Sequence, residues 1–217
     1  RIVTLRAVVI GLCLSILACL WITYSSYLGK SASIPVAHFP VAALFPFVLI
    51  SLVFNPLLRI TGWFRPFRMA ELLVIFFTVL TASAIPGWAF TTYWVALVGT
   101  PLYFATPQNR WETVFFEYLP DWLVASNQGG VMEWFFEGLP AGNSIPWGAW
   151  LPPFVWWASF FLALFVVGAC LMIILRKQWV EYEKLTFPLA QVPVIMARDT
   201  QDGNAYPAFM KNRLFWI

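Results

Sequence analysis

Four long apolar segments alternate with more polar stretches along this chain of 217 residues. They cover residues 7–28, 36–58, 69–98 and 150–175. A helix needs about 20 mostly apolar residues to cross the hydrocarbon core of a bilayer. Each segment is long enough, so the pattern predicts an all-α, polytopic transmembrane helical protein. We expect four spans in this chain, together with short interfacial helices.

The third segment carries a proline and a glycine inside an apolar run, in the stretch TASAIPGWAF. Proline removes a backbone donor and clashes with the preceding turn, and glycine is a poor helix former. We therefore expect this span to be broken at residues 86–87. Broken helices in secondary transporters bind substrates with their freed backbone groups. The candidate substrate-binding residues are Thr81, Ser83, Ile85, Pro86, Gly87 and Trp88. The alternative is a proline kink patched by a neighbouring helix.

An aromatic, acidic segment, residues 99–149, separates spans three and four. In NRWETVFFEYL the apolar residues recur at helical spacing, and Thr106-Pro107 is a start signal for a helix. The stretch VMEWFFEGL repeats the pattern. We expect both helices to lie in the interface plane. They form either a lid over a substrate path or a packed surface without a gating role.

Basic residues give the predicted orientation. Eleven of the 13 Lys and Arg residues lie at the same membrane face, because they flank alternate ends of successive spans; only Lys30 and Arg110 lie at the other. The positive-inside rule makes the basic face cytoplasmic. The N-terminus and the segment 176–213 should therefore be cytoplasmic, and the segment 99–149 should lie outside.

Composition agrees with a membrane protein. Hydrophobic residues make up 61% of the chain and charged residues 11%, whereas soluble domains average about 25% charged residues. The net charge of +3 follows from membrane orientation, so we expect the lipid bilayer as a partner and no nucleic acid. The last residues, NRLFWI, resemble the start of another span. We interpret residues 1–217 as one membrane domain, the N-terminal part of a longer protein.

Two ionisable side chains near the spans are candidates for chemistry. Glu71 lies in the first turn of span three, where a helix macrodipole stabilises an acid; alternatively it is an ion or proton site, with Arg65 and Arg68 close enough to pair with it. His38, the only histidine, lies near the start of span two. It is a candidate ligand for a pigment or haem iron, or else a hydrogen-bonded interfacial histidine.

Motifs of known enzymes are missing from the sequence. GxSxG, HExxH and the Walker A pattern are absent. The three cysteines, Cys13, Cys19 and Cys170, contain no CxxC pair, so they predict neither a metal site nor a disulfide framework. We therefore expect no enzyme, no catalytic residue and no metal site, and the sequence identifies no cofactor.

A set of short motifs resembles an uncharacterised family of bacterial multi-span membrane proteins. They are FPVAALFP, NPLLR, AELL, ASAIPGW, FATPQNRWE, LPDWL, IPWGAW and RKQWVEYEKLTFPLAQVP. The piece LTFPLAQ is also similar, more loosely, to a segment that precedes a span in the oligopeptide transporter superfamily. The resemblance implies a longer protein of the bacterial inner membrane with a dozen or more spans. It carries over no functional residue.

Two functions are consistent with these patterns. The first is a transporter-like protein that moves a small organic solute, such as a peptide or metal chelate, with a proton or cation. Its site would be the break in span three, faced by the LTFP segment. The second is an accessory or structural subunit of a larger membrane complex, associated with a pigment or haem through His38. A transporter would be isolated alone or as a homo-oligomer, and a subunit would remain with its complex.

Overall fold

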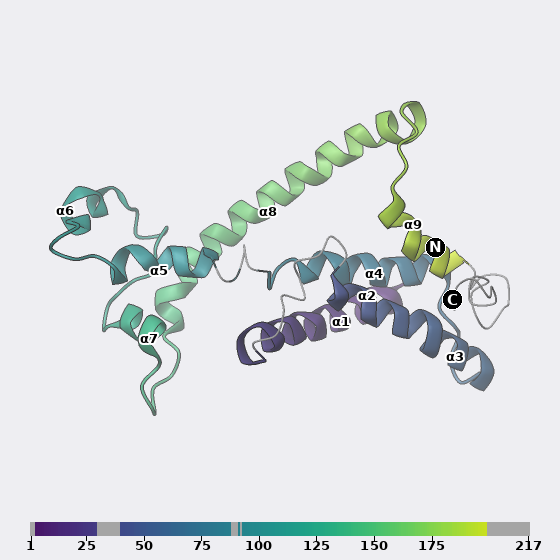
Figure 1. Ribbon diagram of the computed structural model, residues 1–217, viewed down its shortest axis with the longest axis horizontal. Helices are drawn as coiled ribbons and strands as arrows, with labels where there is room; N and C mark the ends of the chain where they lie inside the picture. Colours follow the sequence, from purple (N-terminus) through teal and green to yellow (C-terminus); the bar gives the residue numbers. More distant parts are fainter. Residues whose placement is uncertain (1–2, 30–39, 88–90, 92, 199–217) are drawn as a thin grey trace. The chain divides into compact units, whose positions relative to one another are not determined.

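The computed structural model describes residues 3–29, 40–87, 91 and 93–198. Every regular element in these residues is a helix, which confirms the predicted fold class (Figure 1). The helices form two compact units, Arg1–Thr92 with Thr186–Ile217, and Tyr93–Leu185.

Within the described ranges, the first unit is built of α-helices and wider π-helical turns. They are α1 (Leu5–Thr23) with η1 (Tyr24–Leu28), α2 (Val41–Leu49), η2 (Ile50–Phe54), α3 (Asn55–Thr61), α4 (Met69–Ser83) and α9 (Pro188–Arg198). Local signals set two of the helix ends. The Thr4 hydroxyl caps α1 by accepting from the Ala7 amide at 3.3 Å. Gly62 ends α3 in the left-handed conformation, with φ of 63°, which glycine adopts without strain.

Helices α1 and α4 run parallel and side by side, because Thr4 meets Glu71 at their first turns and Cys19 meets the Ala82 carbonyl near their last turns. Small residues recur on the buried face of α1, namely Ala7, Gly11, Ser15 and Ala18, followed by Ile22. They let the two backbones approach closely, as is common between membrane helices. A Cβ atom on Gly11 would lie 3.2 Å from the Thr78 Cβ and 3.5 Å from the Ile75 Cα.

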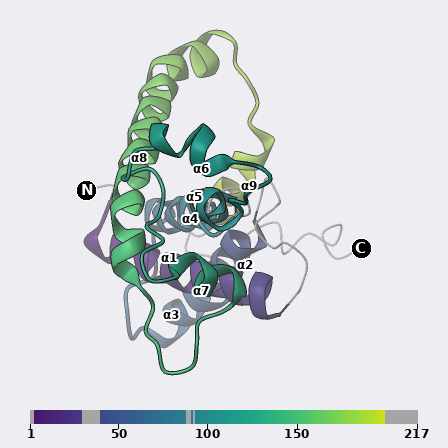
Figure 2. The same cartoon turned by 90° about the vertical axis from the view of Figure 1, so that its left-hand side faces the viewer.

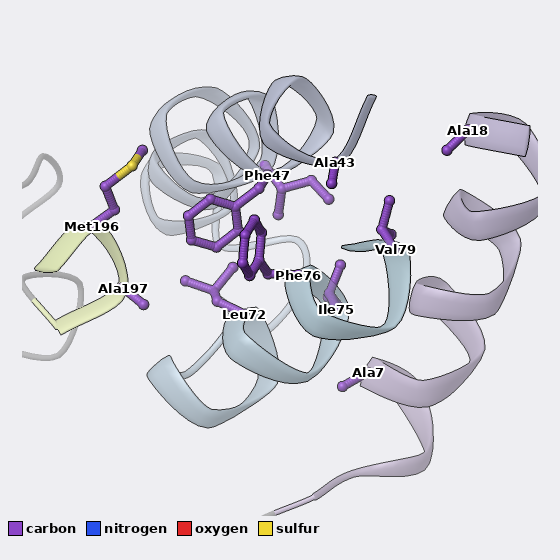
Figure 3. Packing of buried hydrophobic residues seen from close by; sticks show 11 residues of the cluster. Ala7, Ala18, Ala43, Phe47, Leu72, Ile75, Phe76, Val79, Met196 and Ala197 are labelled. Atoms are coloured by element: carbon purple, nitrogen blue, oxygen red, sulfur yellow. The ribbon is translucent and has the colours of Figure 1, made fainter. Parts of the chain in front are cut away.

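Aromatic and aliphatic side chains of α2 and α4 complete this core. The rings of Phe47 and Phe76 lie 4.8 Å apart and are both buried. Helix α9 packs against α4, and Figure 3 places its Met196 and Ala197 beside Phe47 and Leu72, in the first half of α4. The expectation that the LTFP segment faces the break in span three is therefore wrong, since the helix that it starts lies toward the opposite end of α4.

The second unit surrounds the beginning of one long helix. Its elements are α5 (Val95–Tyr103), α6 (Trp111–Val114), the 3₁₀ turn η4 (Phe116–Tyr118), α7 (Val131–Glu137), α8 (Trp147–Lys177) and the π-helical turn η5 (Gln178–Tyr182). Helix α7 lies beside the first turns of α8 (Figure 2). Val98, Ala125, Val131 and Met132 form a small core, against which Trp94, Trp150 and Trp157 pack.

Three helices in the described residues are long and apolar enough to cross a membrane. They are Leu5–Leu28, Val41–Thr61 and Trp147–Tyr182. The region predicted as span three contains a shorter apolar helix, α4, and then α5 in the second unit. Helix α4 stops at Ser83, three residues before Pro86. The outer helix expected from Thr106 begins only at Trp111, because the Asn109 side chain and Thr106 hold residues 106–109 as a turn.

Candidate functional site

The break after α4 is a tight turn that reuses the carbonyl groups at the helix end. The Ala84 amide donates to the Thr81 carbonyl at 3.3 Å, and the Ile85 amide donates to the Ala82 carbonyl at 3.0 Å. The Gly87 amide donates to the Ala84 carbonyl at 3.3 Å. These short-range bonds tighten the chain beyond Ser83, as expected where a helix ends within an apolar region.

Helix α1 also contributes a group to this break. Pro86 has no N–H, so the Ala82 carbonyl lacks the donor that an uninterrupted helix would give it. The Cys19 thiol of α1 lies 3.5 Å from that carbonyl oxygen and donates to it. The break is therefore patched by a neighbouring helix as well as by its own turn.

The polar side chains predicted at the break turn toward their own helix. The Ser83 hydroxyl is buried and donates to the Leu80 carbonyl at 2.7 Å. The Thr81 hydroxyl is exposed and donates to the Phe77 carbonyl at 2.8 Å. Pro86 is buried, whereas the Ile85 side chain is 53% exposed. Trp88 lies outside the described residues.

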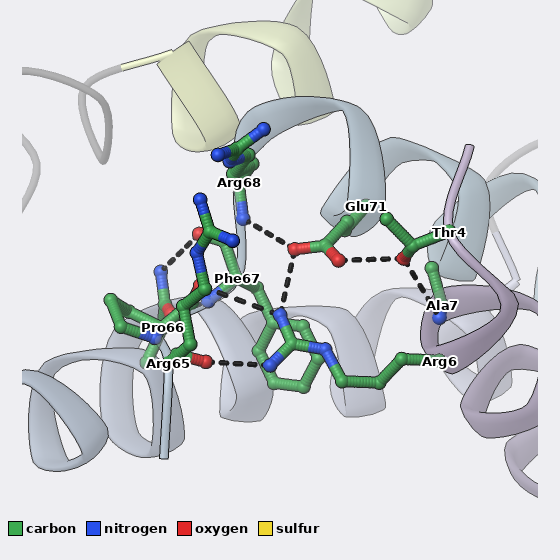
Figure 4. A network of polar contacts seen from close by, with 9 residues as sticks. Thr4, Arg6, Ala7, Arg65, Pro66, Phe67, Arg68 and Glu71 are labelled. Carbon is green, nitrogen blue, oxygen red and sulfur yellow. Dashed lines mark hydrogen bonds and ion pairs between the residues drawn. The ribbon is translucent and has the colours of Figure 1, made fainter. Parts of the chain in front are cut away.

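Glu71 lies at the other end of α4, in a cluster of charged hydrogen bonds (Figure 4). The Arg6 guanidinium forms an ion pair with its carboxylate at 2.8 Å, and the Thr4 hydroxyl donates to its second oxygen at 2.6 Å. The Arg68 backbone amide donates to the carboxylate at 2.9 Å. The glutamate side chain is 6% exposed, so this carboxylate is both buried and paired with a cation.

The pairing of Glu71 differs from the expectation. Arg68 was expected to pair through its side chain, but this side chain points away from the carboxylate (Figure 4). Its backbone serves instead as the N-cap of α4, with Glu71 at the third helical position, which leaves only the amide facing the acid. Arg65 contributes its carbonyl, which accepts from Arg6 at 2.7 Å. The cation that pairs with Glu71 comes from α1.

The loop before α4 is held from two further directions. The Arg6 guanidinium carbon lies 4.5 Å from the centre of the Phe67 ring, a cation–π contact. The buried Asn55 side chain accepts from the Phe67 amide at 2.7 Å and donates to the Phe67 carbonyl at 3.3 Å. Helices α1, α3 and α4 are thus joined at one end through this loop.

The predicted candidates do not form a single site. Glu71 and Ser83 lie twelve residues apart on α4, or about 18 Å along a helix at 1.5 Å per residue. His38 lies outside the described residues, so its association with a pigment or haem stays a prediction. In the part of the chain that the structure describes, no three His, Cys, Asp or Glu side chains gather as metal ligands.

Comparison with known proteins gives the family of this chain. A model of a family of unknown function, DUF6785, matches residues 1–217. The chain belongs to the DUF6785 family. No curated protein and no solved structure matches it. The predicted resemblance to an uncharacterised family is confirmed.

The sequence did not point to four residues that hold the two ends of α4 in this DUF6785 chain: Thr4, Arg6, Cys19 and Asn55. A local signal was available for Thr4, because a threonine directly before an apolar run is a common N-cap. Arg6 and Cys19 act across α1 and α4, in regions separated by more than 60 residues. Their partners depend on how these two helices pack. The alternation of spans predicts that the helices are parallel, but it does not predict which residues face each other.

Proposed function

We propose that this chain belongs to a transporter-like integral membrane protein that moves a small organic solute, such as a peptide or metal chelate. The observation that carries the proposal is the short helix α4. Its 15 residues span about 22 Å, less than the ~30 Å thickness of a hydrocarbon core. It ends at a proline–glycine turn in an apolar region, as the discontinuous helices of secondary transporters do.

The similarity of LTFPLAQ to a segment of the oligopeptide transporter superfamily gives independent support. Under this proposal the solute contacts the turn at residues 84–87, with Thr81 and Ser83 beside it. Trp88 stays a predicted contact. The hydroxyls of Thr81 and Ser83 can exchange their bonds to helix carbonyls for bonds to the solute, because a hydroxyl both donates and accepts. The protein would lie in the inner membrane of a bacterium, with its N-terminus in the cytoplasm.

A proton or cation would accompany the solute through Glu71. It is the buried acid among the described residues, and ionisable groups at membrane depth are candidates for such coupling. Release of its ion pair with Arg6 would be required in the transport cycle. A Glu71→Gln variant that still folds should therefore lose the dependence of uptake on a proton or sodium gradient.

Uptake by the full natural chain in proteoliposomes tests the proposal. The probes are a radiolabelled tripeptide and a radiolabelled iron–citrate chelate. The variant Pro86→Ala/Gly87→Leu changes the turn, since a Cβ on Gly87 would lie 3.0 Å from the Ala84 carbonyl oxygen. Gly168→Leu is the control, because no atom beyond its chain neighbours and its own helix backbone lies within 4 Å of a Cβ at that position. Uptake should fall in the first variant alone; equal uptake in both variants contradicts the proposed site.

A second candidate, a subunit of a larger membrane complex, is favoured by the surface of α8. Each residue from Leu162 to Gln178 is exposed in this chain, so other proteins have room to pack there. Isolation in a mild detergent distinguishes the two functions. A transporter should be recovered alone or as a homo-oligomer, whereas a subunit should be recovered with several other proteins, and a bound pigment or haem would be visible in its absorption spectrum.

A further inference from the structure

The charges at both ends of α1 fix the level of its first turn in the membrane. In the sequence, 23 uncharged residues separate Arg6 from Lys30, a length of about 34 Å as a helix. The hydrocarbon core is about 30 Å thick, and charged side chains belong at its boundary. A spanning α1 therefore has only about 4 Å of slack, and Arg6 lies at one edge of the core.

Contacts hold the loop between α3 and α4, residues 62–68, at this same level. The Glu71 carboxylate accepts from both Thr4 and Arg6, so the Arg6 guanidinium lies beside the first turn of α1. The same guanidinium donates to the Arg65 carbonyl at 2.7 Å and lies 4.5 Å from the centre of the Phe67 ring (Figure 4). The backbone of this loop from Arg65 to Phe67 is therefore at the edge of the core as well.

Two aromatic side chains are exposed in the first part of the loop. Trp63 is 84% exposed and Phe64 67%. Trp63 precedes Arg65 by two residues, so their Cα atoms are at most about 7 Å apart, and the headgroup layer of each leaflet is about 5–7 Å thick. The two rings therefore stay within reach of this layer, where tryptophan is enriched in membrane proteins.

Arginines outnumber acids around these rings. Arg59 lies in the last turn of α3, and Arg65 and Arg68 are exposed. Glu71 is the only acid of the first unit within the described ranges, and Arg6 already pairs with it. Arg65 and Arg68 meet this ion pair through backbone groups, a carbonyl and an amide. The loop therefore presents a net positive charge at the membrane edge, and such a surface attracts anionic lipids.

We propose that the loop of residues 62–68 binds anionic phospholipid. Trp63 and Phe64 insert between headgroups, and the guanidinium groups of Arg65 and Arg68 pair with the lipid phosphate, which their planar donors match. The exposed rings favour lipid over a soluble polyanion, because an acidic protein or a nucleic acid offers no apolar layer for them. The inference does not depend on the solute or on the direction in which the chain crosses the membrane.

Quenching by nitroxide lipids tests the proposal on the full natural chain in phosphatidylcholine vesicles. Cys13, Cys19 and Cys170 are first replaced by Ala, Ser and Ala, and a fluorescent label is attached at Thr61→Cys, an exposed position directly before the loop. The vesicles contain the same small fraction of nitroxide-labelled phosphatidylglycerol or of nitroxide-labelled phosphatidylcholine. The phosphatidylglycerol should quench the label several-fold more strongly, because the loop concentrates anionic lipid around it.

The double variant Arg65→Gln/Arg68→Gln should be quenched equally by the two lipids. Arg176→Gln/Lys177→Gln is the matched control, because it removes two exposed positive charges at the end of α8 instead, and the preference should persist in it. Arg65→Gln alone keeps the carbonyl contact of this residue and should lose part of the preference. It serves as the test if the double variant fails to fold.

Any of several results would overturn the proposal. Equal quenching by the two lipids with the natural loop would show that it has no preference for anionic headgroups. A full preference in Arg65→Gln/Arg68→Gln would show that these arginines do not create it. Weak quenching by both lipids together with strong quenching by iodide would place the loop in water. Loss of the preference on adding inorganic phosphate, at an ionic strength matched with sodium chloride, would show that the loop binds free phosphate instead of lipid.

Discussion

At the scale of single residues, Glu71 shows how a buried charge is accommodated. Three donors, from Thr4, Arg6 and the Arg68 backbone, hold its two oxygens. Removing one partner of a buried pair is costly because the other remains desolvated. Arg6 is partly exposed, with 35% of its side-chain surface accessible, and water can therefore compensate part of the loss.

Glu71→Gln should lower the free energy of unfolding by about 2 kcal/mol, the range for hydrogen bonds to charged groups. Chemical or thermal unfolding in mild detergent measures this change. Glu112→Gln, at an exposed acid of the second unit, is the matched control and should leave stability unchanged. The double variant Arg6→Gln/Glu71→Gln should lose less than the sum of the two single variants. Strict additivity would contradict a direct pair.

Tyr103 offers a test outside the spans. Its hydroxyl donates to the Glu137 carboxylate at 3.0 Å, and this hydrogen bond raises the pKa of Tyr103 above its ordinary value. The phenolate cannot donate and would stand beside a negative charge, so ionisation is disfavoured. Glu137→Gln should therefore lower the pKa of Tyr103 and shift its ionisation to lower pH. Ultraviolet difference titration measures it, with Tyr103→Phe identifying the signal; an unchanged titration would mean that the contact is absent in solution.

At the scale of helices, the close approach of α1 and α4 depends on Gly11. A leucine there must displace the Thr78 side chain or the α4 backbone near Ile75. Overpacking of this kind costs about 1–3 kcal/mol. Gly11→Leu should destabilise the protein by that amount, and Gly11→Ala by less. Gly168→Leu on α8 is the steric control, since open space surrounds that position. Similar unfolding midpoints for both leucine variants would argue against the packing of α1 on α4.

Helices were predictable from the sequence to different degrees. The long apolar runs predict α1 and α8 because a continuous apolar surface over about 20 residues has few other stable environments. Pro86 and Gly87 predict a break because proline disrupts a helix through its own backbone, whatever packs around it. The partner of Glu71 was not predictable, since Arg65 and Arg68 are closer along the chain than Arg6. Which cation pairs with Glu71 depends on the groups that face it. Helix packing and the N-cap of α4 determine these groups.

At the scale of the whole molecule, the distribution of basic residues predicts the direction of insertion. Arg6, Arg65 and Arg176 flank alternate spans and should share the cytoplasmic face, because positive residues close to spans are retained there. The segment containing Asn143 should then face the outside. Both Asn143 and Lys184 are exposed, so either position can report its side of the membrane through an introduced cysteine.

A membrane-impermeant maleimide applied to intact cells tests this orientation in a variant in which Cys13, Cys19 and Cys170 are replaced. Asn143→Cys should react at once, because the loop before α8 is exposed outside. Lys184→Cys should react only after the membrane is permeabilised, because it follows the basic end of α8. The opposite pattern would place the N-terminus outside and reverse the proposed topology. Reaction at both positions in intact cells would mean that α8 does not cross the membrane between them. A spanning helix with a charge-free length of about 43 Å should place the two positions on opposite sides.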